Sequence, residues 1–333
     1  MLQFVQYKYK RFVKLSALIY VLSLVLLTPF SLCAQQEPQF SQYMFNRLSY
    51  NPGYAGSNGA ICLTGFYRNQ WMGMGLTDVY GEASSASTGE TMNFSFDMPV
   101  RFLHGGIGAT IISDKIGYRD NIHAKIDYAF RIQFPTGNLA IGIEAQLFNS
   151  SLDKTQLIGG DVFGEDDQIG TSLDPVLGDL SEQSDFLFDL GAGIYYQIPG
   201  KLYIGLSTSK LLQTSSDNLY WDNRRFYYIL AGYEWALPAY PSLRILPSAL
   251  VKTDFVSKSA YQVDASLLLE WEHKIWGGMT YRVQDAMVLI GGVAFGDFKL
   301  GVSYDIPTSR ISTQSFGSLE LFARFCFKIE NPP

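Results

Sequence analysis

Apolar and polar residues alternate along most of this chain, in stretches of about ten residues that begin near residue 60. The clearest stretch is 121–134, in which every even-numbered residue is apolar and nearly every odd-numbered one is polar. Because successive side chains of a strand point to opposite faces of a sheet, this pattern predicts a strand with one apolar and one polar face.

The same period of two predicts about fourteen strands in all. Regular alternation recurs at 92–98, 139–147, 261–270, 279–284, 298–305 and 318–327. Less regular candidates are 61–71, 105–114, 186–198, 201–208, 225–237, 243–254 and 286–295. Most of these stretches are longer than the five or six residues typical of a sandwich strand, and they suit a tilted crossing of a bilayer.

Short and long connections alternate between these strands. Short ones lie at 135–138, 199–201, 238–242, 273–274 and 296–297. Long ones lie at 72–91, 150–185, 209–224 and 306–316. The 284–286 connection is the one exception we expect, because it is short although it lies at the end of the barrel that carries the long connections. Outer-membrane barrels have an even strand number, short periplasmic turns and longer external loops. Strand parity therefore predicts that both ends of the chain lie in the periplasm.

These patterns predict an all-β fold, a transmembrane antiparallel β-barrel of about fourteen strands. The sheet must close on itself because lipid tolerates no open strand edge. A soluble β-sandwich is the alternative, since its outer faces also alternate. Its wet faces would carry more Lys and Glu than this chain provides.

Composition agrees with a barrel and excludes nucleic acid as a partner. Charged residues make up 17% of the chain, below the roughly 25% of soluble domains. The net charge of -6, with only 25 Lys and Arg among 333 residues, leaves no basic footprint for nucleic acid. After residue 30, no apolar run reaches the roughly 20 residues of a spanning helix.

The first 33 residues have the form of a secretory signal peptide. Basic residues precede the apolar run Leu15 to Leu27, and Ser31 and Cys33 occupy positions -3 and -1 of a cleavage site. An acylated Cys33 is the alternative, which the bulky Leu32 opposes. We expect a signal peptide at 1–33, a periplasmic lead-in segment with a short helical or turn structure at 34–59, the barrel at 60–328 and a tail at 329–333.

No catalytic, metal or cofactor motif stands out. The loop 150–185 is rich in Asp and Glu, which would suit calcium, but it lacks a full EF-hand pattern and is also explained as a solvated acidic loop. His104, His123 and His273 share no ligand spacing, and no nucleophile elbow or phosphate-binding loop is present. We therefore expect no enzyme activity, no cofactor and no metal.

The two cysteines of the expected mature chain lie on the first and last predicted strands. In a closed barrel these strands pair antiparallel, which places Cys62 and Cys326 at the same end. Both are in phase with polar residues and should point into the lumen. Cross-strand neighbours approach to about 4.5–5.5 Å, within reach of a disulfide. We predict a disulfide or a contact at the seam; the alternative is two unrelated small residues.

Four motifs resemble those of the PorP/SprF family of Bacteroidetes outer-membrane proteins. They are "PQFSQYMFN" at 38–46, "NPGYAG" at 51–56, "YRNQW" at 67–71 and "GSLE" at 317–320. Gly53 stands where the family usually has Ala, and Leu319 where it often has His. The resemblance covers essentially the whole mature chain.

This resemblance implies a non-enzymatic component of the type IX secretion and gliding-motility machinery in the outer membrane of a Gram-negative bacterium. The implied partners are the translocon, peptidoglycan-linked periplasmic ring proteins, a secreted surface adhesin and outer-membrane lipid. Whether the chain is a core subunit or a paralogue dedicated to one adhesin is left open. The alternative function is an outer-membrane transport barrel for a hydrophobic or small solute. Such transporters carry an N-terminal hatch of about 40 residues or more, whereas about 25 precede the first strand here.

The segment before the first strand carries the residues we expect to plug the barrel or dock a partner. Its apolar positions have helical spacing, and Asn51-Pro52-Gly53 predicts a turn. We expect one or two helical turns at the periplasmic mouth, with the aromatic face in the lumen or against a partner; a disordered lead-in is the alternative. The plug or docking residues are Phe40, Tyr43, Met44, Phe45, Asn51, Pro52, Tyr54, Arg68 and Trp71.

Overall fold

The computed structural model describes residues 37–74, 87–152, 183–216, 221–222, 224–255 and 261–327. The expected signal peptide, the C-terminal tail and most of the acidic loop 150–185 lie outside the described residues.

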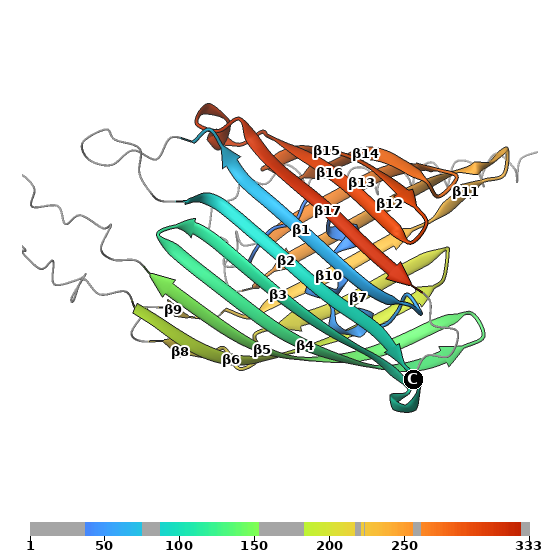
Figure 1. Cartoon of the computed structure of the whole chain (residues 1–333), viewed down its shortest axis with the longest axis horizontal. Helices are drawn as coiled ribbons and strands as arrows, with labels where there is room; N and C mark the ends of the chain where they lie inside the picture. The colour runs from blue at the N-terminus through green and yellow to red at the C-terminus, as the bar shows by residue number, and fades with distance from the viewer. Residues whose placement is uncertain are drawn as a thin grey trace, which may run out of the picture.

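The wall of the molecule is one sheet that closes on itself (Figure 1). Fourteen antiparallel strands form it, in chain order, and the last pairs with the first. They are β1 (Ile61–Met72), β2 (Ser87–Val100), β3 (Gly105–Gly117), β4 (Arg119–Phe134), β5 (Gly137–Leu152), β6 (Gln183–Ile198), β7 (Leu202–Ser209), β10 (Phe226–Tyr233), β12 (Tyr240–Thr253), β13 (Tyr261–Trp271), β14 (Ile275–Arg282), β15 (Ala286–Phe295), β16 (Phe298–Pro307) and β17 (Gly317–Phe327). The predicted barrel and its strand number are confirmed.

Several short elements lie in the connections between these strands. β11 (Trp235–Leu237) continues the β10–β12 hairpin, and β8 (Ser215–Ser216) pairs with β9 (Trp221–Asp222) between β7 and β10. Single 3-10 turns follow β2, at η3 (Arg101–Leu103), and precede β17, at η5 (Arg310–Thr313).

The barrel has a turn end and a loop end. We call the end where β1 begins and β17 finishes the turn end, because its connections are short; the opposite end is the loop end. The expected exception at the loop end, between β14 and β15, is present. A second one, not foreseen, joins β3 to β4 through Tyr118 alone. Gly117 adopts a φ of +62°, a conformation that glycine tolerates, and this allows the tight reversal.

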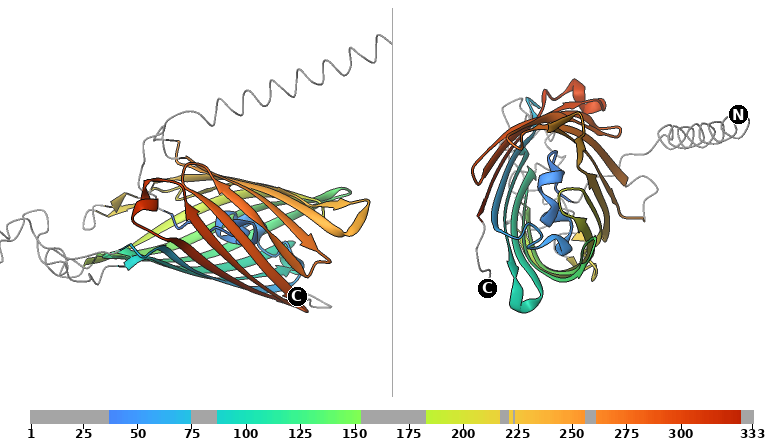
Figure 2. Two further views of the ribbon diagram at one scale, coloured as in Figure 1. Left: turned by 90° about the horizontal axis from the view of Figure 1, so that it is seen from above. Right: turned by 90° about the vertical axis from the view of Figure 1, so that its right-hand side faces the viewer.

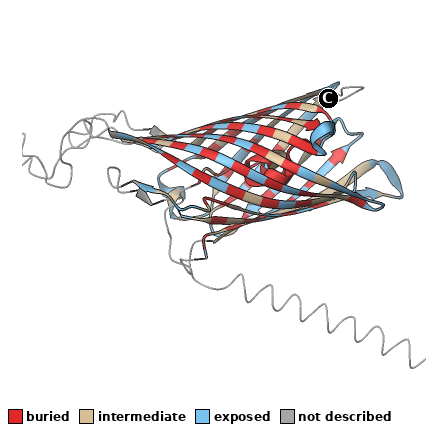
Figure 3. Cartoon of the chain, turned by 90° about the horizontal axis from the view of Figure 1, so that it is seen from below, coloured by how far each residue is buried: buried red, intermediate tan, exposed pale blue. Residues whose placement is uncertain are grey.

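The outward face of the wall is apolar in the middle and aromatic at both ends. Ile126 and Ile143, near mid-strand, are 70% and 61% exposed. Buried and exposed positions alternate along much of the wall (Figure 3), although β12 is mostly of intermediate exposure. Exposed aromatic residues at the turn end are Phe134, Trp235, Tyr240, Trp271, Phe295 and Phe298. Those at the loop end are Phe186, Phe255, Tyr281, Tyr304 and Phe316. An apolar band between two aromatic girdles is typical of a membrane-spanning barrel.

Among the described residues, no helix has the length and apolar character needed to cross a membrane.

The seam between β1 and β17 brings the two cysteines together. In this register Cys62 faces Cys326 and Arg68 faces Glu320. A disulfide joins Cys62 to Cys326, with the two Cα atoms 4.2 Å apart. The bond therefore links the two strands that close the barrel, 264 residues apart in sequence.

We expect this disulfide to form in the cell and to stabilise the closed barrel. Replacing both cysteines with serine should lower the free energy of unfolding by about 2–4 kcal/mol, since the cross-link restricts the unfolded chain. Urea unfolding in detergent measures this, with reduced wild-type protein as the control. Two thiols that react with maleimide in unreduced, denatured wild-type protein would contradict the prediction.

Candidate functional site

A segment of the chain that precedes the wall fills the lumen (Figure 2). It contains three short helical turns: η1 (Tyr43–Phe45), α2 (Arg47–Tyr50) and η2 (Pro52–Tyr54). We call residues 37–56 the plug. Asn46 and Asn51, between the turns, have non-helical backbone angles, so the helical spacing of this segment produces separate turns rather than one helix.

The plug extends along the lumen and is not confined to one mouth. Glu37 contacts Lys210, which directly follows β7 at the loop end. Ala55 and Gly56 contact Arg131, near the turn end of β4. The first described residue, Glu37, therefore lies toward the opposite end from the last residue of β17. The chain termini, which strand parity predicts in the periplasm, lie outside the described residues. The inward polar side chains supply hydrogen-bonding partners at several levels of the lumen, which explains the extended path.

Five charged side chains from five strands form a buried ionic cluster in the loop-end half of the lumen. Arg68 bonds Asp305 at 2.8 Å and Glu320 at 3.4 Å. Arg282 bonds Asp305 at 3.0 Å and Asp264 at 3.3 Å. All five side chains are at most 3% exposed. Three carboxylates thus face two guanidinium groups, and the excess negative charge needs further donors.

The plug supplies those donors. The backbone N–H groups of Ser41 and Gln42 donate to the two carboxylate oxygens of Glu320, at 2.7 and 2.9 Å. The Ser41 hydroxyl donates to Asp305 at 2.6 Å and accepts from Arg68 at 2.7 Å. Gln39 also donates its side-chain amide to Asp264, at 2.9 Å. The plug therefore supplies hydrogen-bond donors to the carboxylates of the ionic cluster, and the cluster in turn holds the plug in the lumen.

Glu37 anchors the plug at the loop end. Its carboxylate bonds the Lys210 ammonium at 2.7 Å, and its carbonyl oxygen accepts from Lys252 at 3.3 Å. Burial by itself would raise the pKa of Glu37, but Lys210 and Lys125 outweigh it and lower that pKa to about 2. The anchor is therefore charged at physiological pH.

The hexapeptide 51–56 fixes the plug in the turn-end half. The Asn51 side chain accepts from Gly53 N–H at 2.8 Å and donates to the carbonyls of Ile194 (3.1 Å) and Leu206 (3.3 Å). These contacts tie η2 to the backbones of β6 and β7. Gly56, at a φ of +67°, is packed so closely on Met98 of β2 that a side chain would strike its carbonyl.

Arg131 of β4 holds the end of this hexapeptide. Its guanidinium donates to the carbonyls of Ala55, at 2.8 Å, and Gly56, at 3.2 Å. Asp97 of β2 accepts from Gly56 N–H at 3.1 Å. The "NPGYAG" motif is thus bound at both termini, through the Asn51 side chain at one and through the backbone of Ala55 and Gly56 at the other.

Aromatic contacts fill the middle of the lumen. Phe45 stacks on Phe322, with ring centroids 4.9 Å apart, and lies 5.3 Å from Trp276. The Arg47 guanidinium lies 3.8 Å from the centre of the Tyr203 ring, a cation–π contact. These contacts give the plug apolar packing in addition to its polar bonds.

Glycines on the inner face of the wall make room for the plug. At each of them an added Cβ would overlap an atom of the plug; they are Gly106, Gly142, Gly193, Gly205 and Gly301. At Gly142 of β5 the obstructing atoms are the backbone of Pro52 and Gly53, which no side-chain rotation can move away.

Replacing Gly142 with alanine should therefore loosen the plug. We expect faster proteolysis of residues 37–56 in detergent than in wild type, measured by limited digestion and mass spectrometry. Gly277→Ala is the matched control, since an added Cβ there meets only Ile290 O at 3.7 Å. Equal proteolysis of the two variants would contradict the proposed close contact.

The structure brings most of the predicted site residues together in the lumen. Seven belong to the plug, and Arg68 lies in the ionic cluster that binds it. Trp71 lies outside the plug, at the loop end of β1, where it lines a small pocket with Arg68 and Asp305 and its backbone N–H donates to Ser318 Oγ at 3.1 Å.

Sequence reasoning missed several contributors to the site. They are Ser41, Gln42, Asp97, Arg131, Asp264, Arg282, Asp305 and Glu320. The strand residues were recognisable as inward charges, but their partners were not. Among the described residues, no group of His, Cys, Asp and Glu could hold a metal ion, which leaves most of the acidic loop untested.

Comparison with known proteins gives one family and several barrels. A family model described as "Type IX secretion system membrane protein PorP/SprF" matches residues 32–325. The Acinetobacter baumannii outer membrane protein Omp33 is similar in structure at 7% identity and a TM-score of 0.44, covering 80% of this chain and 98% of that one.

Two further solved structures are similar. The monoaromatic hydrocarbon channel CymD shows 10% identity and a TM-score of 0.48, covering 86% of this chain and 94% of its own. A Pseudomonas aeruginosa FadL homologue shows 10% identity and a TM-score of 0.40, covering 83% and 92%. No curated protein matches the chain.

Proposed function

The chain belongs to the PorP/SprF family of type IX secretion system membrane proteins, and from this premise we propose that it is a plugged, non-enzymatic barrel of the outer membrane that supports secretion or surface attachment of a partner adhesin. The even strand number and the alternation of short turns and long loops support this location. In this orientation the turn end faces the periplasm and the loop end faces the outside.

The plug is the observation that carries the proposal. Its contacts occupy the lumen from Glu37 at the loop end to Gly56 near the turn end, through ion pairs, backbone hydrogen bonds and stacked rings. A barrel filled in this way suits a scaffold that works through its two rims. A transport barrel for a hydrophobic or small solute would require the plug to leave the lumen, breaking the contacts with the ionic cluster.

The two rims would serve different partners. At the turn end we propose docking of the translocon and of the peptidoglycan-linked periplasmic ring proteins of the secretion and gliding machinery. At the loop end we propose contact with the secreted adhesin. The family supports association with secretion machinery, and the closed lumen favours partners that bind the rims.

Co-purification from outer membranes tests the proposal. The tagged full chain, extracted in mild detergent, should enrich type IX components over an equally tagged, unrelated barrel when both are analysed by mass spectrometry. A strain lacking the chain should lose one adhesin from its surface by proteomics. A strain that exports every adhesin normally but fails to take up one small solute would favour the transport alternative.

A further inference from the structure

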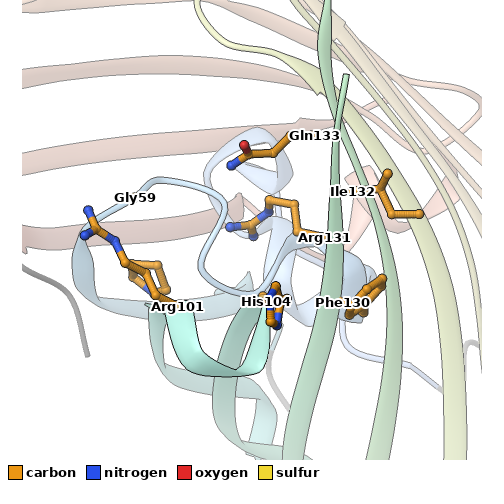
Figure 4. A pocket seen from close by; sticks show the side chains of 9 residues that line it. Gly59, Arg101, His104, Phe130, Arg131, Ile132 and Gln133 are labelled. Atoms are coloured by element: carbon orange, nitrogen blue, oxygen red, sulfur yellow. The ribbon is translucent and has the colours of Figure 1, made fainter. Parts of the chain in front are cut away.

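A notch interrupts the rim of the barrel at the turn end (Figure 4). β3 begins at Gly105, which pairs with Phe130, whereas β4 continues to Phe134 and projects beyond it. The 3-10 turn η3 lies beside this projection. Between them is a pocket of about 610 Å³. We call this pocket the rim notch.

The rim notch is basic. Arg101 and His104, both exposed, line it from the η3 side, and Arg131 lines it from β4. The Arg131 guanidinium is hydrogen-bonded to carbonyl groups of the plug, and its positive charge adds to that of the rim notch. No carboxylate is among the described residues that line the pocket. The nearby Asp97 is 4% exposed and bonded to Gly56 N–H, so it does not compete for a ligand.

One side of the rim notch continues into the membrane-facing surface. Phe130 and Ile132 line it and belong to the outward, apolar phase of β4, at 44% and 37% exposed. Phe102 of η3, which follows Arg101 in the sequence, is 72% exposed. Phe134 of the turn-end aromatic girdle follows on the same strand, which places the notch at the level where lipid head groups begin.

We propose that the rim notch binds an anionic phospholipid, with the phosphate on the basic side lined by Arg101 and His104 and an acyl chain along Phe130 and Ile132. Basic pockets beside membrane-embedded surfaces suit lipid phosphates. A free phosphate ion would find the same basic side chains, but it would leave the apolar side unused. The site does not depend on the proposed secretion function. That proposal contributes only the orientation of the barrel, which makes the periplasmic leaflet the source of the lipid.

Native mass spectrometry of the purified full chain tests this site. Wild-type protein exchanged into phosphatidylglycerol should retain at least one more lipid than the same protein in phosphatidylcholine. Arg101→Gln should reduce that retention about fivefold, because a cation near the membrane surface contributes roughly 1 kcal/mol to binding. Lys201→Gln is the matched control, since Lys201 is an exposed cation in another turn at the same end.

Three outcomes would overturn the proposal. Equal retention of phosphatidylglycerol by wild type and Arg101→Gln would remove the site. Loss of the lipid in Lys201→Gln to the same degree would reduce the effect to general surface charge. Inorganic phosphate bound in equilibrium dialysis as tightly as the lipid would make this a site for free phosphate. Unchanged thermal unfolding of the variants verifies that each of them is folded.

Discussion

Replacing Arg68 with methionine should lower the free energy of unfolding of the barrel by about 3–5 kcal/mol. Arg68 is the cation shared by Asp305 and Glu320, and its side chain is 1% exposed. Its loss leaves two buried carboxylates with too few partners, and it removes the donor to Ser41 of the plug. The cost of an uncompensated buried charge dominates the expected effect.

Unfolding of the purified protein by urea, followed by tryptophan fluorescence, measures this loss. Lys115→Met is the matched control, because the Lys115–Asp120 pair at 3.2 Å is 49% exposed on both sides and should contribute at most about 1 kcal/mol. The triple variant Arg68→Met, Asp305→Asn, Glu320→Gln should regain part of the stability. No difference between Arg68→Met and Lys115→Met would mean that the cluster does not hold the barrel.

Removing the plug should convert a closed barrel into an open one. With residues 37–56 deleted, we expect stepwise ion conductance in planar bilayers, whereas the wild-type chain should conduct little. The physical reason is the width of a barrel of fourteen strands. Its inward-pointing side chains do not fill the lumen by themselves. The exposed lumen would be polar and charged, and therefore wet.

A synthetic peptide of residues 37–59, added to the deletion variant, should reduce the conductance. This rescue distinguishes a removed plug from a misfolded barrel, and Gly142→Ala in the full chain offers a milder route to the same opening. Equal conductance by wild type and deletion variant would show that the plug does not seal the lumen. The same deletion, tested for adhesin export, asks whether the plug also matters for secretion.

The amphipathic period of two carried most of what could be predicted from the sequence. It assigns each strand residue to the lumen or the lipid, since one face meets water and the other meets hydrocarbon. For that reason the strand number, the closed sheet and the inward direction of Cys62, Arg68 and Glu320 follow from the sequence. The connection through Tyr118 was missed, because a one-residue turn leaves no stretch of loop composition.

The partners within the lumen follow from the tertiary structure alone. Arg68 and Asp305 are 237 residues apart and lie on strands two positions apart around the wall. Whether they meet depends on the stagger of the strands, a property of the whole closed barrel. The path of the plug is decided in the same way: Ser41 reaches carboxylates on β16 and β17, and Asn51 reaches carbonyls on β6 and β7, two parts of the sheet that face one lumen because the barrel is closed. Local alternation determines which face a side chain takes, whereas closure of the barrel determines the level at which it meets another.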